Sequence, residues 1–307
     1  MPTRPAVLER NQLLLESAEA RAAREVARAY NAARRELVDV LITRWTGPGT
    51  LTPRDAVDLL RRLALLQNID ARLMGLEREV GVILRAVVGN MSELAVEQIG
   101  RELALLPPSL RPDLAAFTMI DTAMVEQVVP VVMEEVTGLT TLLRTQLRRE
   151  LQNGLIQGES FPDLVRRLMA ATPTGEGPAV WANGQLSAER MTRRTVVSAN
   201  NTAKQRQLEK VNAQGGVKVQ KQWVASIGSK TTATCLHLHG QIRDVDQPFD
   251  VTHEPRFARQ VMAAPAHWNC RSSVVMWHES FETGALPTSK LREDAKSEIA
   301  RREKEKE

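Results

Sequence analysis

The sequence predicts an α+β protein that is predominantly α, in which a bundle of long N-terminal helices precedes a small C-terminal α+β module with a short antiparallel sheet. Aromatic residues make up only 4% of the 307 residues, and Ala, Leu, Val, Arg and Glu dominate the first 200 positions. That composition favours long helices over a β-sandwich. Apolar residues recur there at three- and four-residue steps, whereas the strand-like alternation begins only after residue 216.

The first helix is expected over residues 5–45, because apolar side chains recur along it with Arg and Glu between them. Members of this apolar stripe are Leu8, Leu15, Ala22, Val26, Ala29, Ala33, Leu37, Val40 and Ile42. The Gly- and Pro-containing segment 46–50 ends the helix. A second helical tract is expected from Thr52, as N-cap, and Pro53, in the first turn, to about Leu106.

Prolines divide the remainder of the helical half. Pro107 and Pro108 force a connection, because the residue before a proline is pushed out of the helical region. A third tract is expected from Asp113 to about Gly154, and Pro130 should kink or split it. Long tracts with short connections predict antiparallel neighbours in a bundle.

Shorter elements follow the bundle. A helix is expected from Pro162 to about Ala171, a loop over 172–184 where Gly and Pro gather, and another helix from about Ser187 to Val211. Residues 217–225 alternate and carry β-branched side chains, which predicts a strand. A second apolar run, 273–277, is expected to pair with it.

The charge balance is ordinary for a soluble protein. The formal charge is +4, but 41 basic residues nearly offset 37 acidic ones, which does not favour a dedicated nucleic-acid binder. The N-terminus lacks a signal-peptide pattern, and no run approaches the roughly 18 apolar residues of a membrane span. We therefore expect a protein that is made in the cytoplasm and stays soluble there, with no membrane partner. Two cysteines cannot form a disulfide framework.

Metal-binding side chains gather in one stretch. Both cysteines and all five histidines lie between Cys235 and His278. Because His267 and Cys270 are separated by two residues, both can reach one metal from a single turn. Cys235 with His239, or His237 as a substitute, could complete a tetrahedral structural zinc site. The alternative is a metal-free cluster that packs and hydrogen-bonds between two strands.

Two other functions use the same residues. In a metal-dependent nuclease, His267 would activate water, but Asp244, Asp246 and Asp250 do not form the paired carboxylates of a two-metal site. A DNA-organising protein would use basic side chains of the 187–211 helix to contact phosphates. These side chains are Arg190, Arg193, Arg194, Lys204 and Arg206. The ordinary interpretation of such residues is a solvated helix face.

The order of motifs resembles the Mu-type phage head morphogenesis family, or minor head proteins, between Leu147 and Trp277. That family has a Trp-bearing strand, then Thr-x-x-x-(His or Cys)-x-x-Leu-Asp-Gly, a Pro-Phe step and Pro-x-His-x-x-Cys-Arg-Cys. The matching residues are Trp223, Thr231, Cys235, Leu238, Gly240, Pro248, Phe249, Pro265, His267, Cys270 and Arg271. Gly154-Leu155, Gly158-x-Ser160 and Arg194-Thr195 resemble upstream motifs of the family.

Three positions depart from the family pattern. His239 stands where the family has Asp, Ser272 replaces the last Cys, and Val196 replaces a helix Glu. The missing Cys weakens the expectation of a four-ligand metal site built on the family pattern, while His237 and His239 offer replacements.

The resemblance implies a structural minor head protein of a tailed phage or prophage that is not an enzyme. It would bind the portal protein, act in capsid assembly and DNA packaging or delivery, and lie inside the virion near the portal vertex. The major capsid or scaffolding protein and viral DNA are further expected partners. Along the chain we expect a helical docking region at 1–146, a head-morphogenesis module at 147–280 and a charged tail at 281–307. A toxin-like enzyme or nuclease packaged with the genome is the alternative.

Overall fold

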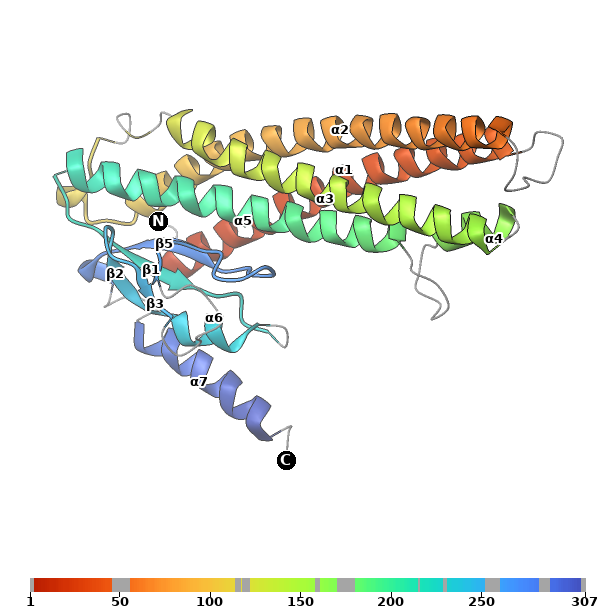
Figure 1. Ribbon diagram of the computed structural model, residues 1–307. Coiled ribbons are helices and arrows are strands. Elements are labelled where there is room, and N and C mark those ends of the chain that lie inside the picture. Colours follow the sequence, from red (N-terminus) through yellow and green to blue (C-terminus); the bar gives the residue numbers. More distant parts are fainter. Residues whose placement is uncertain are drawn as a thin grey trace. The chain divides into compact units, whose positions relative to one another are not determined.

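The computed structural model describes most of the chain (Figure 1). The described residues are 3–45, 56–113, 117, 122–157, 161–169, 180–214, 216–228, 231–251, 260–281 and 288–304. The helices are α1 (Arg4–Trp45), α2 (Ala56–Leu103), α3 (Thr122–Ile156), α4 (Phe161–Met169), α5 (Val180–Gln214), α6 (Ala233–Leu238) and α7 (Thr288–Lys304). The predominantly α, α+β class predicted from the sequence is confirmed.

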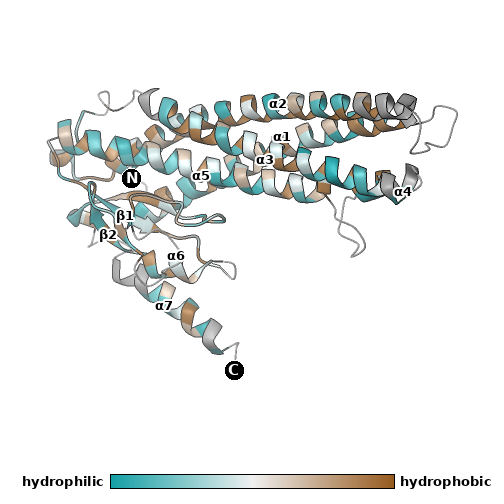
Figure 2. Ribbon diagram, in the orientation of Figure 1, coloured by the Kyte–Doolittle hydropathy of each residue, from teal (hydrophilic) through white to brown (hydrophobic). Residues whose placement is uncertain are grey.

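Most helix boundaries follow the sequence pattern. α1 matches the expected first helix, and α2 runs unbroken through the glycines at 75, 81 and 89. The expected N-cap at Thr52 lies outside the described residues. α3 continues through Pro130, so of the two expected effects, a kink or a split, the split does not occur. Figure 2 shows apolar and polar residues interspersed along these helices, as their amphipathic pattern predicts.

The loop predicted over 172–184 is wrong at its C-terminal end, since α5 begins at Val180. Val180 and Trp181 are buried, and the Trp181 ring centroid lies 5.7 Å from that of Tyr30. Burial of two large apolar side chains stabilises this first turn more than the weak helix propensity of Gly184 opposes it.

Contacts divide the described chain into two units, which we describe separately. Unit 1 comprises residues 1–21, 86–129 and 193–307, and unit 2 comprises 22–85 and 130–192. The helices α1, α2, α3 and α5 each contribute one segment to each unit. The boundaries predicted at 146 and 280 are boundaries along the chain and stay a prediction.

Unit 2 is helical and combines an apolar core with a few polar links. Leu37, Leu76 and Leu84 are fully buried in it. Glu77 of α2 accepts hydrogen bonds from Thr137 and Thr140 of α3, at 2.7 and 2.9 Å. These contacts fix the register between the two helices in this unit.

Unit 1 contains the sheets. In the three-stranded sheet, β1 (Gln220–Val224) lies between β2 (Ile242–Asp244) and β5 (Ser273–Trp277), antiparallel to both. β3 (Phe249–Asp250) and β4 (Gln260–Val261) form a separate antiparallel pair. The predicted pairing of the two apolar runs is therefore confirmed. The N-terminal end of α1 lies beside the sheet (Figure 1), where Arg4 donates a hydrogen bond of 2.8 Å to Gln222.

The apolar core of unit 1 draws on distant parts of the sequence. Trp223 is fully buried and meets Phe249 edge to face, with ring centroids 5.2 Å apart. Leu103 and Leu106, at and just after the end of α2, belong to the same buried cluster as these rings. The C-terminal module thus completes its core with side chains from before residue 130.

The charged tail predicted at 281–307 contains the helix α7, Thr288–Lys304. α7 contacts α6, and Ala295 is buried there. None of the described helices has the length and apolar character needed to cross a bilayer.

Candidate metal centre

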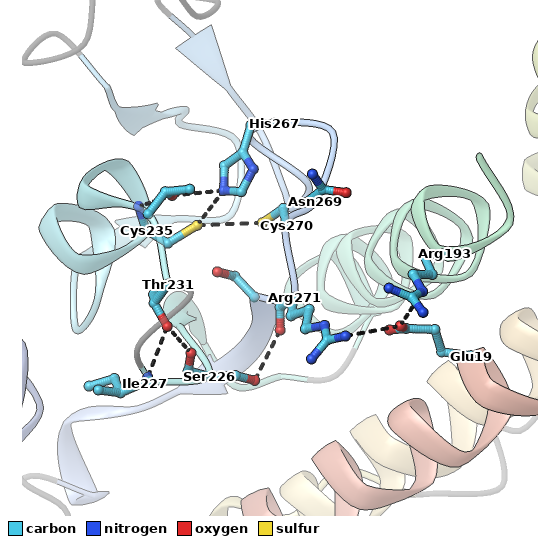
Figure 3. A pocket seen from close by; sticks show the side chains of 13 residues that line it. Glu19, Arg193, Ser226, Ile227, Thr231, Cys235, His267, Asn269, Cys270 and Arg271 are labelled. Atoms are coloured by element: carbon cyan, nitrogen blue, oxygen red, sulfur yellow. Dashed lines mark hydrogen bonds and ion pairs between the residues drawn. The ribbon is translucent and has the colours of Figure 1, made fainter. Parts of the chain in front are cut away.

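Cys235, His267 and Cys270 converge at one point of unit 1 (Figure 3). Cys235 Sγ lies 3.0 Å from His267 Nε2 and 3.6 Å from Cys270 Sγ. The three candidate ligand atoms all lie within 4.8 Å of one another, and both cysteines are buried free thiols. The sequence prediction that these three residues meet is borne out.

The local structure explains how Cys235 reaches this point. Thr232 caps α6, with its hydroxyl accepting a hydrogen bond from Cys235 N at 3.3 Å. Cys235 therefore lies in the first turn of a short helix, on its buried face. Thr232 Oγ1 also lies 2.8 Å from His267 Nε2, so one hydroxyl contacts both sides of the cluster.

The other two side chains come from a turn just before β5. Cys270 N donates to the His267 carbonyl oxygen at 3.1 Å, which closes a tight turn. This turn directs the two side chains to the same side. Because β5 pairs with β1 and α6 follows β1 closely in the chain, sheet formation brings Cys270 to Cys235.

The electrostatics of the cluster favour one thiolate. Hydrogen bonding from the Cys235 thiol, assisted by His267 and Ser272, lowers the pKa of Cys270 to about 4 despite burial. The same hydrogen bond, followed by burial, raises the pKa of Cys235. A thiolate is the form of cysteine that binds metals, so the centre holds a negatively charged sulfur beside an imidazole.

The donor set fits zinc. Two cysteines and one histidine are ligands that zinc takes at about 2.3 and 2.0–2.1 Å. Tetrahedral geometry at those bond lengths places two sulfurs about 3.8 Å apart, close to the 3.6 Å between Cys235 and Cys270. The cluster needs only a small expansion from Cys235 to His267 to hold the ion.

His239, predicted as a ligand, is not in this set. Its ring Nδ1 accepts a hydrogen bond of 2.8 Å from Ala225 N. The backbone N–H of His239 donates to the Cys235 carbonyl at the end of α6. Burial lowers the pKa of His239 to about 4, against an opposing effect of Asp294. The side chain is thus a neutral acceptor that joins α6 to the strand β1. His239 is the C-cap of α6, where the backbone leaves the helix (φ −56°, ψ 126°), and its ring bonds to Ala225 instead of reaching the metal ligands.

The other histidines lie apart from the cluster. His237 is exposed and lines a hollow between α6 and α7 together with His239. His278 contacts Ser280 through Nδ1 at 2.8 Å. His253 lies outside the described residues. The expected substitution of His237 for His239 is therefore not seen either.

A pocket of about 550 Å³ opens beside the three ligands. Its lining residues are Glu19, Arg193, Ser226, Ile227, Gly228, Thr231, Thr232, Cys235, His267, Asn269, Cys270, Arg271 and Ser272. Glu19 Oε1 lies 3.3 Å from Arg193 Nε and 3.8 Å from Arg271 Nη2 (Figure 3). Burial raises the pKa of Glu19, while Arg271 and Arg193 act to lower it.

Glu19 was not predicted from the sequence. It lies on the apolar stripe of α1, four residues after Leu15 and three before Ala22. A carboxylate on a buried helix face is the signal that could have revealed it, because such a group needs a partner.

The basic residues of α5 do not form one solvated face. Lys204 is fully buried, donates to Ser273 at 3.1 Å and lies 3.9 Å from Glu102. Arg194 stacks on Trp268, 4.3 Å from the ring centroid. The prediction of a solvated helix face is therefore wrong for Lys204, because the side of α5 that carries this residue packs against β5 in unit 1.

Most residues singled out by the sequence motifs have structural roles. Trp223, Leu238 and Phe249 belong to the buried core. Gly240 has φ 77°, a conformation that favours glycine, and its N–H donates to Trp223 O at 2.8 Å. The Thr231 hydroxyl accepts from Gly228 N and donates to the carbonyl of Ser226. The motifs thus specify a folded unit around the two cysteines.

Comparison with known proteins agrees with these motifs. Residues 145–275 match the model of the family described as Phage Mu protein F like protein. No curated protein and no solved structure matches the chain.

Proposed function

Residues 145–275 resemble the Mu F-like family of phage head morphogenesis proteins, and from this we propose that the chain is a structural minor head protein of a tailed phage or prophage. It binds the portal protein, acts in capsid assembly and DNA packaging or delivery, and resides in the virion near the portal vertex. The family match is the observation that supports this proposal most directly. The role requires no catalysis.

The helical part supplies surfaces for docking. Met74 and Val82 of α2 are 57% and 67% exposed, and Leu142 of α3 is 54% exposed. Large apolar side chains in water at helix surfaces favour contact with another helical assembly. We assign portal contact to these side chains of unit 2.

The test is co-purification with the portal oligomer from cells that express both proteins. Met74→Ser with Val82→Ser should lower the affinity for the portal at least about a hundredfold and so nearly abolish recovery, because burying each of two such side chains stabilises an interface by about 1.5–3 kcal/mol. Leu110→Ser, at an exposed side chain of unit 1, is the matched control. Normal heads assembled without the protein, together with no recovery on portal, would contradict the proposal.

We also propose that Cys235, His267 and Cys270 hold a structural zinc ion. The ion would tie α6 to the turn before β5, and a metal clip of this kind stabilises a small module strongly. Elemental analysis of protein purified without chelator should give about one zinc per chain. Cys270→Ser should abolish it, whereas His278→Ala should leave it unchanged. A wild-type content below a few tenths of an equivalent would remove the zinc proposal.

A nuclease uses the same histidine differently. His267 Nε2 lies 3.0 Å from Cys235 Sγ (Figure 3), which suits a ligand, whereas a general base must be free to take a proton from water. Incubation of the zinc- or magnesium-loaded protein with plasmid DNA should give no cleavage. Cleavage that His267→Ala abolishes would establish the enzyme instead.

A further inference from the structure

The three ligands leave one corner of a zinc tetrahedron to be filled. Within the part of the chain that the structure describes, no further His, Cys, Asp or Glu joins Cys235, His267 and Cys270 at ligand distance. All three line the same pocket. A tetrahedral zinc site that the protein closes has four protein ligands, whereas a site with three protein ligands takes a water or another molecule as the fourth.

We infer that the fourth position of this zinc site opens into the adjoining pocket and binds an oxyanion, a phosphate or carboxylate group, that Arg271 and Arg193 hold beside the metal. The inference rests on the proposed zinc site and adds a ligand to it. The pocket, at about 550 Å³, lies within the range of small-molecule sites.

The charges in the pocket select an anion. Zinc with two thiolates and a neutral imidazole has no net charge. Arg193, Arg271 and Glu19 together carry +1, since Glu19 offsets only one of the two guanidinium groups. The net positive charge of the pocket lining therefore attracts an anion bound to the metal.

The two arginines retain donor capacity. Arg193 Nε is buried and its N–H has no hydrogen-bond acceptor among the described residues, although Glu19 lies at ion-pair distance. The Arg271 side chain is 56% exposed and meets Glu19 only at 3.8 Å. Guanidinium groups bind phosphate and carboxylate through paired N–H donors. Neutral donors add to them, because the hydroxyl of Thr231 and the amide of Asn269 also line the pocket.

The experiment uses the full chain with Co²⁺ in place of zinc, because the visible absorption of Co²⁺ reports its ligands. Inorganic phosphate, acetate and a 5′-phosphorylated oligonucleotide are titrated separately. A saturable spectral change with phosphate or acetate is expected. A change with the oligonucleotide that matches the one with phosphate would identify a nucleic-acid phosphate as the source, and a change with phosphate alone would identify free phosphate.

Variants separate the pocket from the metal. Arg271→Ala should weaken anion binding about tenfold, because one charge-assisted hydrogen bond is lost, without changing Co²⁺ stoichiometry. Arg190→Ala, at an exposed position three residues before Arg193 on α5, should leave the anion affinity unchanged. Equal anion affinity in Arg271→Ala and wild type would overturn the assignment of the arginine.

The Co²⁺ titration distinguishes a missing metal site from a metal site that binds no anion. If Co²⁺ does not bind at all, the metal centre itself is absent. If Co²⁺ binds and neither anion alters its spectrum, the zinc proposal stands and the oxyanion ligand is refuted. His253 and Glu254 are potential ligands that lie outside the described residues. A Co²⁺ spectrum that changes in His253→Ala or Glu254→Ala without added anion would also refute the inference, because the chain itself would then supply the fourth ligand.

Discussion

Glu102 joins separate segments of unit 1 through one carboxylate. It accepts hydrogen bonds from Asn11 Nδ2 at 2.9 Å and from Met276 N at 2.6 Å, and Lys204 Nζ lies 3.9 Å away. Glu102 and Lys204 are each only 1% exposed. α1, α2, α5 and β5 are thus held together by a buried ion pair and its hydrogen bonds, a network that is costly to leave half satisfied.

Lys204→Met should lower the free energy of unfolding by about 3 kcal/mol, because it leaves the Glu102 carboxylate buried without its cation. Urea unfolding followed by circular dichroism measures this. Lys204→Met combined with Glu102→Gln should recover part of the loss, since no buried charge remains. If the single variant were as stable as wild type, the ion pair would have no structural role.

Lys221 predicts a pH dependence. Its side chain is buried and donates to Met262 O at 2.8 Å and to Gln205 Oε1 at 3.2 Å. Burial lowers its pKa to about 8, against the opposing effects of Glu209 and Asp246. The unfolded chain, with a pKa near 10.5 for this group, then binds more protons than the folded chain between pH 8 and 10.5.

The stability contributed by Lys221 should therefore rise between pH 8 and 10.5, by at most about 3 kcal/mol. Below pH 8 both states hold the proton, and the contribution no longer changes. Lys221→Met should remove this rise, and the difference between the two urea-unfolding series isolates it from other alkaline groups. Parallel pH profiles for variant and wild type would contradict the assigned shift.

Single residues were predictable where chain spacing alone brings them together. His267 and Cys270 share one turn, so their spacing was sufficient. Glu19 and Thr232 could not be predicted as neighbours of His267 and Cys270. The positions of Glu19 and Thr232 depend on how α1 and the sheet pack together in unit 1. His239 was predicted as a metal ligand because it is close to Cys235 in sequence. That closeness does not show in which direction the chain leaves α6, and the His239 ring lies against Ala225 instead.

At the scale of elements, the turn after α6 fixes the residue at which β2 starts to pair with β1. Gly240 N donates to Trp223 O, and Gln241 O accepts from Trp223 N at 3.0 Å. These two bonds start the antiparallel pairing of β1 with β2. The turn requires the positive φ of Gly240.

Gly240→Ala should lower the free energy of unfolding by about 1–2 kcal/mol, since an alanine in the left-handed region is strained. Thermal unfolding checks this. Gly228→Ala is the matched control, because an added Cβ there meets nothing within 4 Å and no positive φ constrains the residue. Equal melting temperatures for the two variants would show that the turn relaxes at no cost.

Helices were predicted better than the short strands. The apolar stripe of α1 repeats along a helix of 42 residues, so its helical period is clear in the sequence. The strands β3 and β4 have two residues each, too few for a periodic signal. Pro130 does not split α3, because apolar side chains on both sides of it are packed: Val128 lies against a buried cluster and Val132 is buried.

At the scale of the molecule, unit 1 is assembled from three separated stretches of chain. Its core includes Ile99, Leu103, Leu106 and Phe117, all outside the segment that matches the family model. The motifs identify the segment, but its complete core could not be predicted from them, since long-range packing leaves no local pattern.

A fragment of residues 145–275 should therefore fail to fold cooperatively on its own, because its buried faces lack those side chains. Dispersed signals in a proton–nitrogen NMR spectrum of the fragment would contradict this. Addition of zinc tests whether the metal can compensate, and we expect it to order only the surroundings of the two cysteines. The full chain, prepared in parallel, is the control.

The hydrogen bonds from Arg4 to Gln222 and to the carbonyl of Met276 have a consequence for synthesis. The ribosome synthesises Arg4 218 residues before Gln222 and 272 residues before Met276. All of the chain that forms unit 2 has by then been made. Unit 2 is thus free to form on the nascent chain before unit 1, in which Arg4 finds its partners only after β1 and β5 have been synthesised.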